Sequence, residues 1–129
     1  MPNTNESLLR HAYDLFAKGD VPGFLALCAP EIRFKVPGHN RLTGDHTTPS
    51  FLAALGPAMA ATGNSFREEI VHLAVGDTDG FVLASQQVQR DGKTLRWNAV
   101  HHWRIAGGKL TQFWEFVDDE RTYDAAWAA

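Results

Sequence analysis

The chain has 129 residues, of which 44% are hydrophobic and 21% charged, a balance typical of a soluble globular domain. Its twelve basic and fifteen acidic side chains give a formal net charge of −3 without a run of either sign, so neither nucleic acid nor a membrane is an expected partner. At this length we expect a single domain over residues 1–129, large enough to fold without a disulfide or a metal.

The sequence also carries signals about its compartment. Cys28 is the only cysteine, so no internal disulfide is possible, which fits a reducing compartment. The first residues contain no basic region followed by a long apolar run, so we expect no signal peptide. No apolar stretch reaches about 18 residues, the length at which a transmembrane helix is expected. We therefore predict a cytoplasmic protein.

The first part of the chain has two helical patterns followed by a strand pattern. Apolar residues at helical spacing predict a first helix that ends at Gly19. Asp20 is expected to cap a second, short helix that carries Cys28, as a buried and inert thiol, and stops at Pro30. Apolar and charged residues then alternate over residues 31–36, which predicts a half-buried strand.

A loop and a third helix are expected next. Residues 37–46 are rich in glycine and polar side chains, which is typical of a loop. Thr48 followed by Pro49 is a favourable helix start, and Gly63 is expected to end that helix. Pro57 lies inside the helix and should kink or shorten it, because proline has no backbone N–H to donate.

The second half of the chain predicts four strands and a last short helix. The expected strands cover residues 65–76, 80–89, 93–105 and 109–117. They should be joined as antiparallel hairpins, the first of them bulged or covered on both faces. Asp118 or Asp119 should cap the last helix. This order of elements predicts an α+β domain with helices on one face of a sheet.

Three segments, taken in their order along the chain, resemble the cystatin-like α+β cone shared by nuclear transport factor two, ketosteroid isomerase and the SnoaL-like polyketide cyclases. They are "AKGDVPGFLALCAPEIRF" (residues 17–34), "LTGDHTTPSFLAAL" (42–55) and "HHWRIAGGKLTQFWEFVDD" (101–119). The resemblance implies a curved antiparallel sheet wrapped around N-terminal helices, forming a cone with a deep apolar pocket at its centre. It does not supply an activity, because these proteins serve many functions on one fold.

The turn between the last two strands decides which side chains face that pocket, because side chains alternate across a strand. If residues 106–108 form a three-residue turn, Ile105 pairs with Lys109. His101 and Glu115 are then diagonal neighbours on one face, roughly 6–8 Å apart at Cβ. On the same face we expect Trp97, Ala99, Trp103, Phe113 and Val117.

A two-residue turn is the alternative register for this hairpin. It would pair Ile105 with Leu110 and put His102, rather than His101, on the face of the glutamate. We prefer the three-residue turn, because it brings onto one face the positions that line the pocket in the resembling enzymes. His102 is then expected on the outer face.

His101 and Glu115 are the predicted catalytic residues, since they match the histidine and acid that the cyclases carry on their last two strands. The resemblance argues against ketosteroid isomerase chemistry, because the three positions of that catalytic set read Ala12, Val36 and His101. Tyr13 is one residue away from the tyrosine position and should point about 100° away from it on a helix.

The predicted substrate-binding residues follow from the faces and from the resemblance. They are Tyr13, Val36, His39, Gln86, Val88, Trp97, Trp103, Phe113 and Val117. Gln86 and Val88 stand where the limonene epoxide hydrolases carry an arginine and an aspartate, so that catalytic set is incomplete as well. His39 belongs to the loop that usually rims the pocket mouth.

We predict no metal and no cofactor. No two histidines are four residues apart on a predicted helix, and the adjacent His101 and His102 should face opposite ways. The chain also has no glycine-rich loop of the kind that binds phosphates.

Two functions fit this pattern. In the first, Glu115, helped by His101, moves a proton beside the carbonyl group of a hydrophobic molecule, as an isomerase, cyclase or lyase would. In the second, the same pocket binds a small hydrophobic ligand without chemistry. The partner of Glu115 separates them: a bond to Arg96 or Arg104 would make its charge structural, whereas His101 or an open cavity favours the enzyme.

The outer face of the sheet predicts a homodimer, as the resemblance also implies. Val100, Trp114 and Phe116 should lie together on that face. Soluble monomers rarely expose a contiguous apolar patch of more than a few hundred Å². A second copy of the chain is therefore the expected partner, besides the small hydrophobic molecule.

Overall fold

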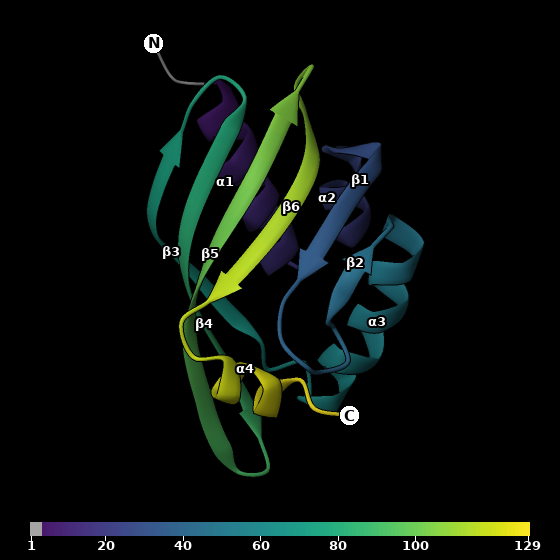
Figure 1. Cartoon of the computed structure of the whole chain (residues 1–129), viewed down its shortest axis with the longest axis vertical. Helices are drawn as coiled ribbons and strands as arrows, with labels where there is room; N and C mark the ends of the chain where they lie inside the picture. Colours follow the sequence, from purple (N-terminus) through teal and green to yellow (C-terminus); the bar gives the residue numbers. More distant parts are fainter. Residues whose placement is uncertain (1–3) are drawn as a thin grey trace.

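The computed structural model describes residues 4–129, and Figure 1 shows the path of the chain through them. The helices are α1 (Thr4–Ala17), α2 (Val21–Ala26), α3 (Thr48–Ala61) and α4 (Glu120–Ala126). The strands are β1 (Cys28–Val36), β2 (Gly44–His46), β3 (Arg67–Val75), β4 (Asp79–Arg90), β5 (Lys93–Ala106) and β6 (Lys109–Val117). Within these residues no helix is long and apolar enough to cross a membrane.

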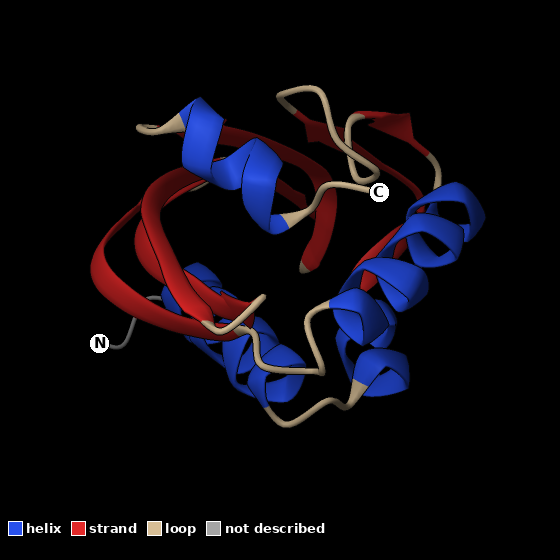
Figure 2. Ribbon diagram, turned by 90° about the horizontal axis from the view of Figure 1, so that it is seen from below, coloured by secondary structure: helices blue, strands red, loops and turns tan. Residues whose placement is uncertain are grey.

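The strands form one mixed sheet in the order β2-β1-β6-β5-β4-β3. Neighbouring strands are antiparallel, except that β1 runs parallel to β6. Figure 2 shows the sheet curving around one side of the molecule, with the helices lying across from it. The predicted α+β class, with a curved sheet wrapped around helices, is confirmed.

Capping side chains fix where the helices start. Asp20 precedes α2 and accepts a hydrogen bond from the backbone N–H of Gly23 at 2.9 Å. Asp119 does the same for α4, accepting from the N–H of Thr122 at 3.1 Å. Such caps satisfy N–H groups that have no partner inside the helix. Of the two residues predicted to cap the last helix, Asp119 is therefore the one that does so.

The start of β1 differs from the prediction. Helix α2 ends at Ala26, and Cys28 is the first residue of the strand rather than part of the helix. Strand β1 pairs with β6 at Cys28 and again from Arg33, with an irregular stretch between them that contains Pro30. Proline is tolerated there because no ladder hydrogen bond requires its missing N–H. The thiol is buried as predicted, and burial raises the pKa of Cys28 to about 12.

Two other features of this part of the chain differ from what the sequence predicted: the loop contains a strand, and of the two effects expected of Pro57 the shortening does not occur. The predicted loop of residues 37–46 contains β2, which is too short to show a periodic pattern and pairs with the end of β1. Helix α3 is not shortened at Pro57 but continues to Ala61. Leu55 and Ala58 are buried on either side of the proline, and their packing holds the helix across one lost hydrogen bond.

The concave side of the sheet and the helices enclose two groups of buried side chains. The first includes Leu9, Phe24, Ile32, Phe34, Val82, Trp103 and Leu110. The second includes Leu55, Val88, Trp97, Ala99, Tyr123 and Trp127. The cavity described next takes its wall from both of these core clusters.

Candidate active site

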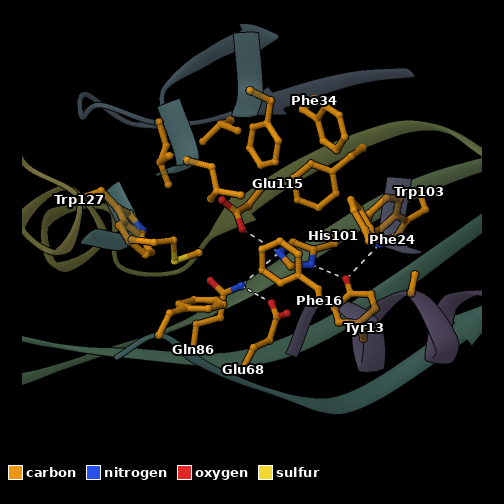
Figure 3. Close-up of a pocket in the computed structure, with 18 of the residues that line it drawn as sticks. Tyr13, Phe16, Phe24, Phe34, Glu68, Gln86, His101, Trp103, Glu115 and Trp127 are labelled. Carbon is orange, nitrogen blue, oxygen red and sulfur yellow. Dashed lines mark hydrogen bonds and ion pairs between the residues drawn. The ribbon is translucent and has the colours of Figure 1, made fainter. Parts of the chain in front are cut away.

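A cavity with a volume of about 90 Å³ takes its wall from both core clusters. Its apolar wall includes Phe16, Phe24, Phe34, Phe51, Phe66, Trp103, Phe113 and Trp127. Its polar wall consists of Tyr13, Glu68, Gln86, His101, Glu115 and Tyr123. Figure 3 shows that most of these polar side chains gather on one side of the cavity and are joined by hydrogen bonds.

The hairpin between β5 and β6 has a two-residue turn. Gly107 and Gly108 have positive φ angles of 58° and 74°, which suits the tight turn that links strands of normal twist. Ile105 pairs with Leu110 as a result. The predicted three-residue turn was therefore wrong, and the two-residue turn that we gave as the alternative is the one that forms.

A bulge nevertheless restores the predicted faces. Arg104 pairs with Gln112, so Thr111 is an extra residue in β6 and has no partner in β5. One extra residue exchanges the two faces of a strand. His101 therefore lies directly opposite Glu115, on the face that lines the cavity.

His101 and Glu115 form a buried pair in the cavity wall. Nε2 of His101 lies 2.7 Å from Oε2 of Glu115, and the two residues are 3% and 7% exposed. The hydroxyl of Tyr123 donates to the other carboxylate oxygen, Oε1, at 2.5 Å. No arginine or lysine within residues 4–129 forms an ion pair with Glu115, and Arg104 lies near Asp79 instead.

Tyr13 extends this pair on the other side of the imidazole ring. Its hydroxyl lies 2.5 Å from Nδ1 of His101 and accepts a hydrogen bond from Nε1 of Trp103 at 3.0 Å. Both Ala12 and Tyr13 line the cavity, so the tyrosine does not point away from it. The angle between neighbouring residues on a helix predicted that Tyr13 would point elsewhere, but its side chain is long enough to reach the cavity from the flank of α1.

Gln86 and Glu68 lie beside the histidine on β4 and β3. Oε1 of Gln86 accepts a hydrogen bond from Nε1 of Trp97 at 2.7 Å. Since indole N–H can only donate, this bond fixes the orientation of the amide. Nε2 of Gln86 therefore faces the other way, donating to Oε2 of Glu68 and lying 3.5 Å from Nε2 of His101.

Our sequence analysis missed Glu68. Two adjacent glutamates, Glu68 and Glu69, stand near the start of β3, and a bulge between Ile70 and His72 breaks the alternation that would have told them apart. The usable signal was cross-strand pairing with Gln86, which is an inward position of β4. Tyr123 was missed because α4 contributes to the cavity only through the tertiary fold.

The surroundings change the pKa values of several groups. Burial lowers the pKa of His101, but the hydrogen bond to Glu115 and the charges of Glu115 and Glu68 outweigh it, so this pKa is raised. Burial raises the pKa of Glu68 despite the opposing effects of the His101 charge and the Gln86 amide. Burial also raises the pKa of Tyr13 and that of Tyr123, which keeps both hydroxyls protonated near neutral pH.

The hydrogen-bond donors and acceptors allow the cluster two protonation states. When His101 is neutral, the hydroxyl of Tyr13 can donate to Nδ1 while Nε2–H donates to Glu115. When His101 is charged, Nδ1–H donates to Tyr13, and the hydroxyl hydrogen becomes free to bond a molecule in the cavity. The cluster is therefore chemically able to present a proton to a bound acceptor.

The predicted wall residues fall into two groups. Those that line the cavity are Tyr13, Val36, Gln86, Trp103 and Phe113. Trp97 and Val88 are buried in the second core cluster instead, where Trp97 packs edge-on against Tyr123. Val117 is partly exposed at the end of β6, and His39 is exposed. Neither contributes to the cavity wall, so four of the nine predicted substrate-binding residues do not line this cavity.

One group of side chains in the described part of the chain has the ligand types of a metal site. Ligand atoms of His39, Glu120 and Asp124 lie within 4.8 Å of one another at the surface. Oδ1 of Asp124 already accepts hydrogen bonds from the backbone N–H of His39 and from Nδ2 of Asn40, both at 2.8 Å. These bonds give Asp124 a structural role in holding the loop before β2.

The comparisons with known proteins agree on one family. The model of the SnoaL-like domain matches residues 9–113. The uncharacterized protein Rv0034 of Mycobacterium tuberculosis is 29% identical over 124 residues, which cover 94% of each chain.

Solved structures share the fold. Bal32a, from a soil-derived mobile gene cassette, superposes with a TM-score of 0.88 at 23% identity and 96% coverage of both chains. A protein of unknown function with a cystatin-like fold from Xanthomonas campestris has a TM-score of 0.86 at 21% identity, covering 99% of this chain and 100% of its own. TerC, co-crystallized with polyporic acid, has a TM-score of 0.81 at 19% identity, covering 96% and 98%. At these identities the likeness concerns the fold.

Proposed function

Because this chain belongs to the SnoaL-like domain family, we propose that it is a small enzyme that moves protons on a hydrophobic molecule containing a carbonyl group. The observation that carries the proposal is the buried pair of His101 and Glu115, which faces an apolar cavity and has no arginine or lysine of residues 4–129 bound to the glutamate. Burying an ion pair of this kind costs free energy, and a role in proton transfer would explain why it is buried here.

The hydrogen-bonded chain suggests how the pair acts. Glu115 favours the charged form of His101, and charged His101 donates to Tyr13. The hydroxyl of Tyr13 can then donate to the oxygen of a bound carbonyl, where negative charge develops as a neighbouring C–H bond breaks. His101 and Glu115 thus share the proton, and Tyr13 donates the hydrogen bond to the molecule in the cavity.

The cavity limits the size of the ligand. Sites for drug-sized molecules measure about 300–1,000 Å³, whereas this cavity measures about 90 Å³. Its aromatic wall suits a flat, unsaturated ring. We therefore propose a compact cyclic ketone or one end of a longer molecule, and the co-crystal of the similar TerC with polyporic acid supports ligand binding by such a fold.

The test uses β-tetralone, a compact ketone fused to an aromatic ring. Wild-type protein should accelerate exchange of the ketone's α-hydrogens in D₂O, followed by proton NMR. Glu115→Gln should remove most of that acceleration, since general acid–base catalysis contributes about 10²–10⁴-fold. Glu69→Gln is the matched control, because Glu69 is exposed on the neighbouring position of β3. Exchange no faster than in protein-free buffer would contradict the proposal.

The alternative is a binding protein without chemistry. It is favoured by the fact that both oxygens of Glu115 already have donors inside the protein, His101 and Tyr123. In that case β-tetralone should shift the NMR signals of cavity residues without exchanging its own hydrogens faster.

The second partner that we propose is another copy of the chain, bound to the outer face of the sheet. Phe81, His102 and Trp114 form one row across β4, β5 and β6, and Val100 and Phe116 lie in the next row. Phe81, Trp114 and Phe116 are 47%, 40% and 47% exposed. Large aromatic side chains that are this exposed on adjacent strands favour association.

A further inference from the structure

We propose that Glu68, rather than Glu115, is the carboxyl group that exchanges a proton with a carbon atom of the bound molecule. This inference rests on the proposed function and assigns its base. The two glutamates lie on opposite sides of His101, Glu68 on β3 and Glu115 on β6. Their hydrogen-bond partners give them different tasks.

Each oxygen of Glu115 already accepts a hydrogen bond. Its Oε2 is bonded to His101 at 2.7 Å and its Oε1 to the hydroxyl of Tyr123 at 2.5 Å. This geometry suits Glu115 to orient His101 and to favour its charged form.

Glu68 keeps one oxygen free. Gln86 donates to its Oε2, and no residue among those described donates to its Oε1. The side chain lines the cavity and is partly buried. The carboxyl group is thus fixed at one oxygen and open at the other, which is the arrangement that a general base requires.

Gln86 is the residue that positions this base. Its amide cannot rotate without losing the hydrogen bond from Trp97, because the indole N–H has no acceptor function. The NH₂ group therefore points steadily at Glu68. This explains why a glutamine, polar and only 4% exposed, occupies the middle of an apolar sheet face.

The proposed step is a proton transfer that balances without a co-reactant. The ionised Glu68 takes the proton from the carbon next to the carbonyl group, and the C–H electron pair becomes the C=C bond of an enol or enolate. The carbonyl π pair moves to the oxygen, which accepts a hydrogen bond or proton from Tyr13. Protonated Glu68 then exchanges its proton with water and returns a solvent-derived proton to the same carbon, which gives exchange, or it passes the proton to a conjugated carbon, which gives isomerisation.

The charges around Glu68 are compatible with this role. His101 on β5, Glu115 on β6 and Tyr13 on α1 are the titratable groups that face it. Burial raises its pKa, and the negative charge of Glu115 raises it further, while the charge of His101 opposes both. A carboxylate with a raised pKa is a stronger base than an exposed glutamate.

The test compares Glu68→Gln with Glu69→Gln, the same chemical change one residue further along β3 on an exposed position. With β-tetralone in D₂O, Glu68→Gln should slow the exchange of α-hydrogens by about 10²–10⁴-fold. Its affinity for the ketone, measured by NMR titration, should stay within about threefold, and Glu69→Gln should match wild type. Glu68→Asp keeps a carboxylate and should retain part of the rate, which separates loss of the base from loss of the fold.

The dependence of the exchange rate on pH supplies the second measurement. In wild type the rate should rise with pH as Glu68 loses its proton, and this rise should be absent in Glu68→Gln. If Glu68→Gln exchanges β-tetralone at the wild-type rate while Glu115→Gln does not, the assignment to Glu68 is overturned and the proposed enzyme stands. If the wild type itself gives no acceleration, the proposed function is overturned together with it.

Discussion

Replacing Glu115 by glutamine keeps the shape of the side chain and removes its charge. The new amide can still accept from Tyr123 through its oxygen and donate to Nε2 of His101 through its nitrogen. This arrangement forces His101 to carry its proton on Nδ1 and to stay neutral. The variant should therefore fold, lose the charged form of its histidine and lose proton transfer.

The loss of stability can be worked out from the hydrogen bonds. Bonds to charged groups contribute about 1.5–3 kcal/mol and neutral ones about 0.5–1.5 kcal/mol. Exchanging the carboxylate partner of His101 and Tyr123 for an amide should thus lower the free energy of unfolding by about 1–3 kcal/mol. In a chain of this length each kcal/mol lowers Tm by about 3–5 °C.

The pH dependence has a definite sign. The folded-state pKa of His101 is raised, so its charged form stabilises the fold fully below its unfolded pKa of about 6.5. That stabilisation disappears as the pH rises through the higher folded-state value. The difference between wild type and Glu115→Gln should therefore shrink with rising pH over this range.

Urea unfolding at a series of pH values, followed by tryptophan fluorescence, measures this difference. Glu69→Gln should track the wild type at every pH, because its side chain is exposed. A stability gap between wild type and Glu115→Gln that stays constant from about pH 6 to pH 9 would refute the reasoning, since the charged pair would then contribute nothing.

Three further results are expected. Tyr123→Phe removes one of the two donors to Glu115 and should cost about 1.5–3 kcal/mol in urea unfolding; a cost below about 0.5 kcal/mol would show that solvent replaces the hydroxyl. Trp114→Glu should convert a dimer to a monomer in light scattering with an unchanged circular dichroism spectrum, and a wild-type monomer at tens of micromolar would contradict the proposed interface. Cys28 should react with a thiol reagent only on unfolding, since burial raises its pKa to about 12; rapid modification of the folded protein would contradict this.

Much of the fold could be predicted because apolar periodicity records which face each long element buries. Helix α1 and strands β4 to β6 show clear periods of 3.6 and 2, and turns such as Asp91-Gly92, with positive φ angles of 52° and 74°, mark their ends. Strand β2 has three residues, too few for a period. The start of β1 was hidden because Pro30 ends helices and most strands alike, and is tolerated here in an irregular stretch.

The pair of His101 and Glu115 on a single hairpin could be predicted, whereas the contacts that tertiary packing brings to the histidine could not. His101 and Glu115 share a face by alternation, although the predicted turn was too long and the bulge at Thr111 compensated for it. Tyr13 and Glu68 come from other elements, α1 and β3. Their approach to the histidine depends on how α1 packs against the sheet and on the irregular register of β3, neither of which has a local signal.

The two glutamates show how neighbouring groups of one type acquire different chemistry. Glu115 receives donors on both oxygens and lies within a hydrogen bond of His101, so ionisation of the pair is mutually favourable. Glu68 receives one donor, from Gln86, and desolvation acts on it with less compensation. Glu115 is held in place and favours the charged form of the histidine, whereas Glu68 is less stabilised and can accept a proton. The two residues thus have complementary roles in one acid–base site. Because both carboxylates act on His101, the pKa of the histidine depends on both of them.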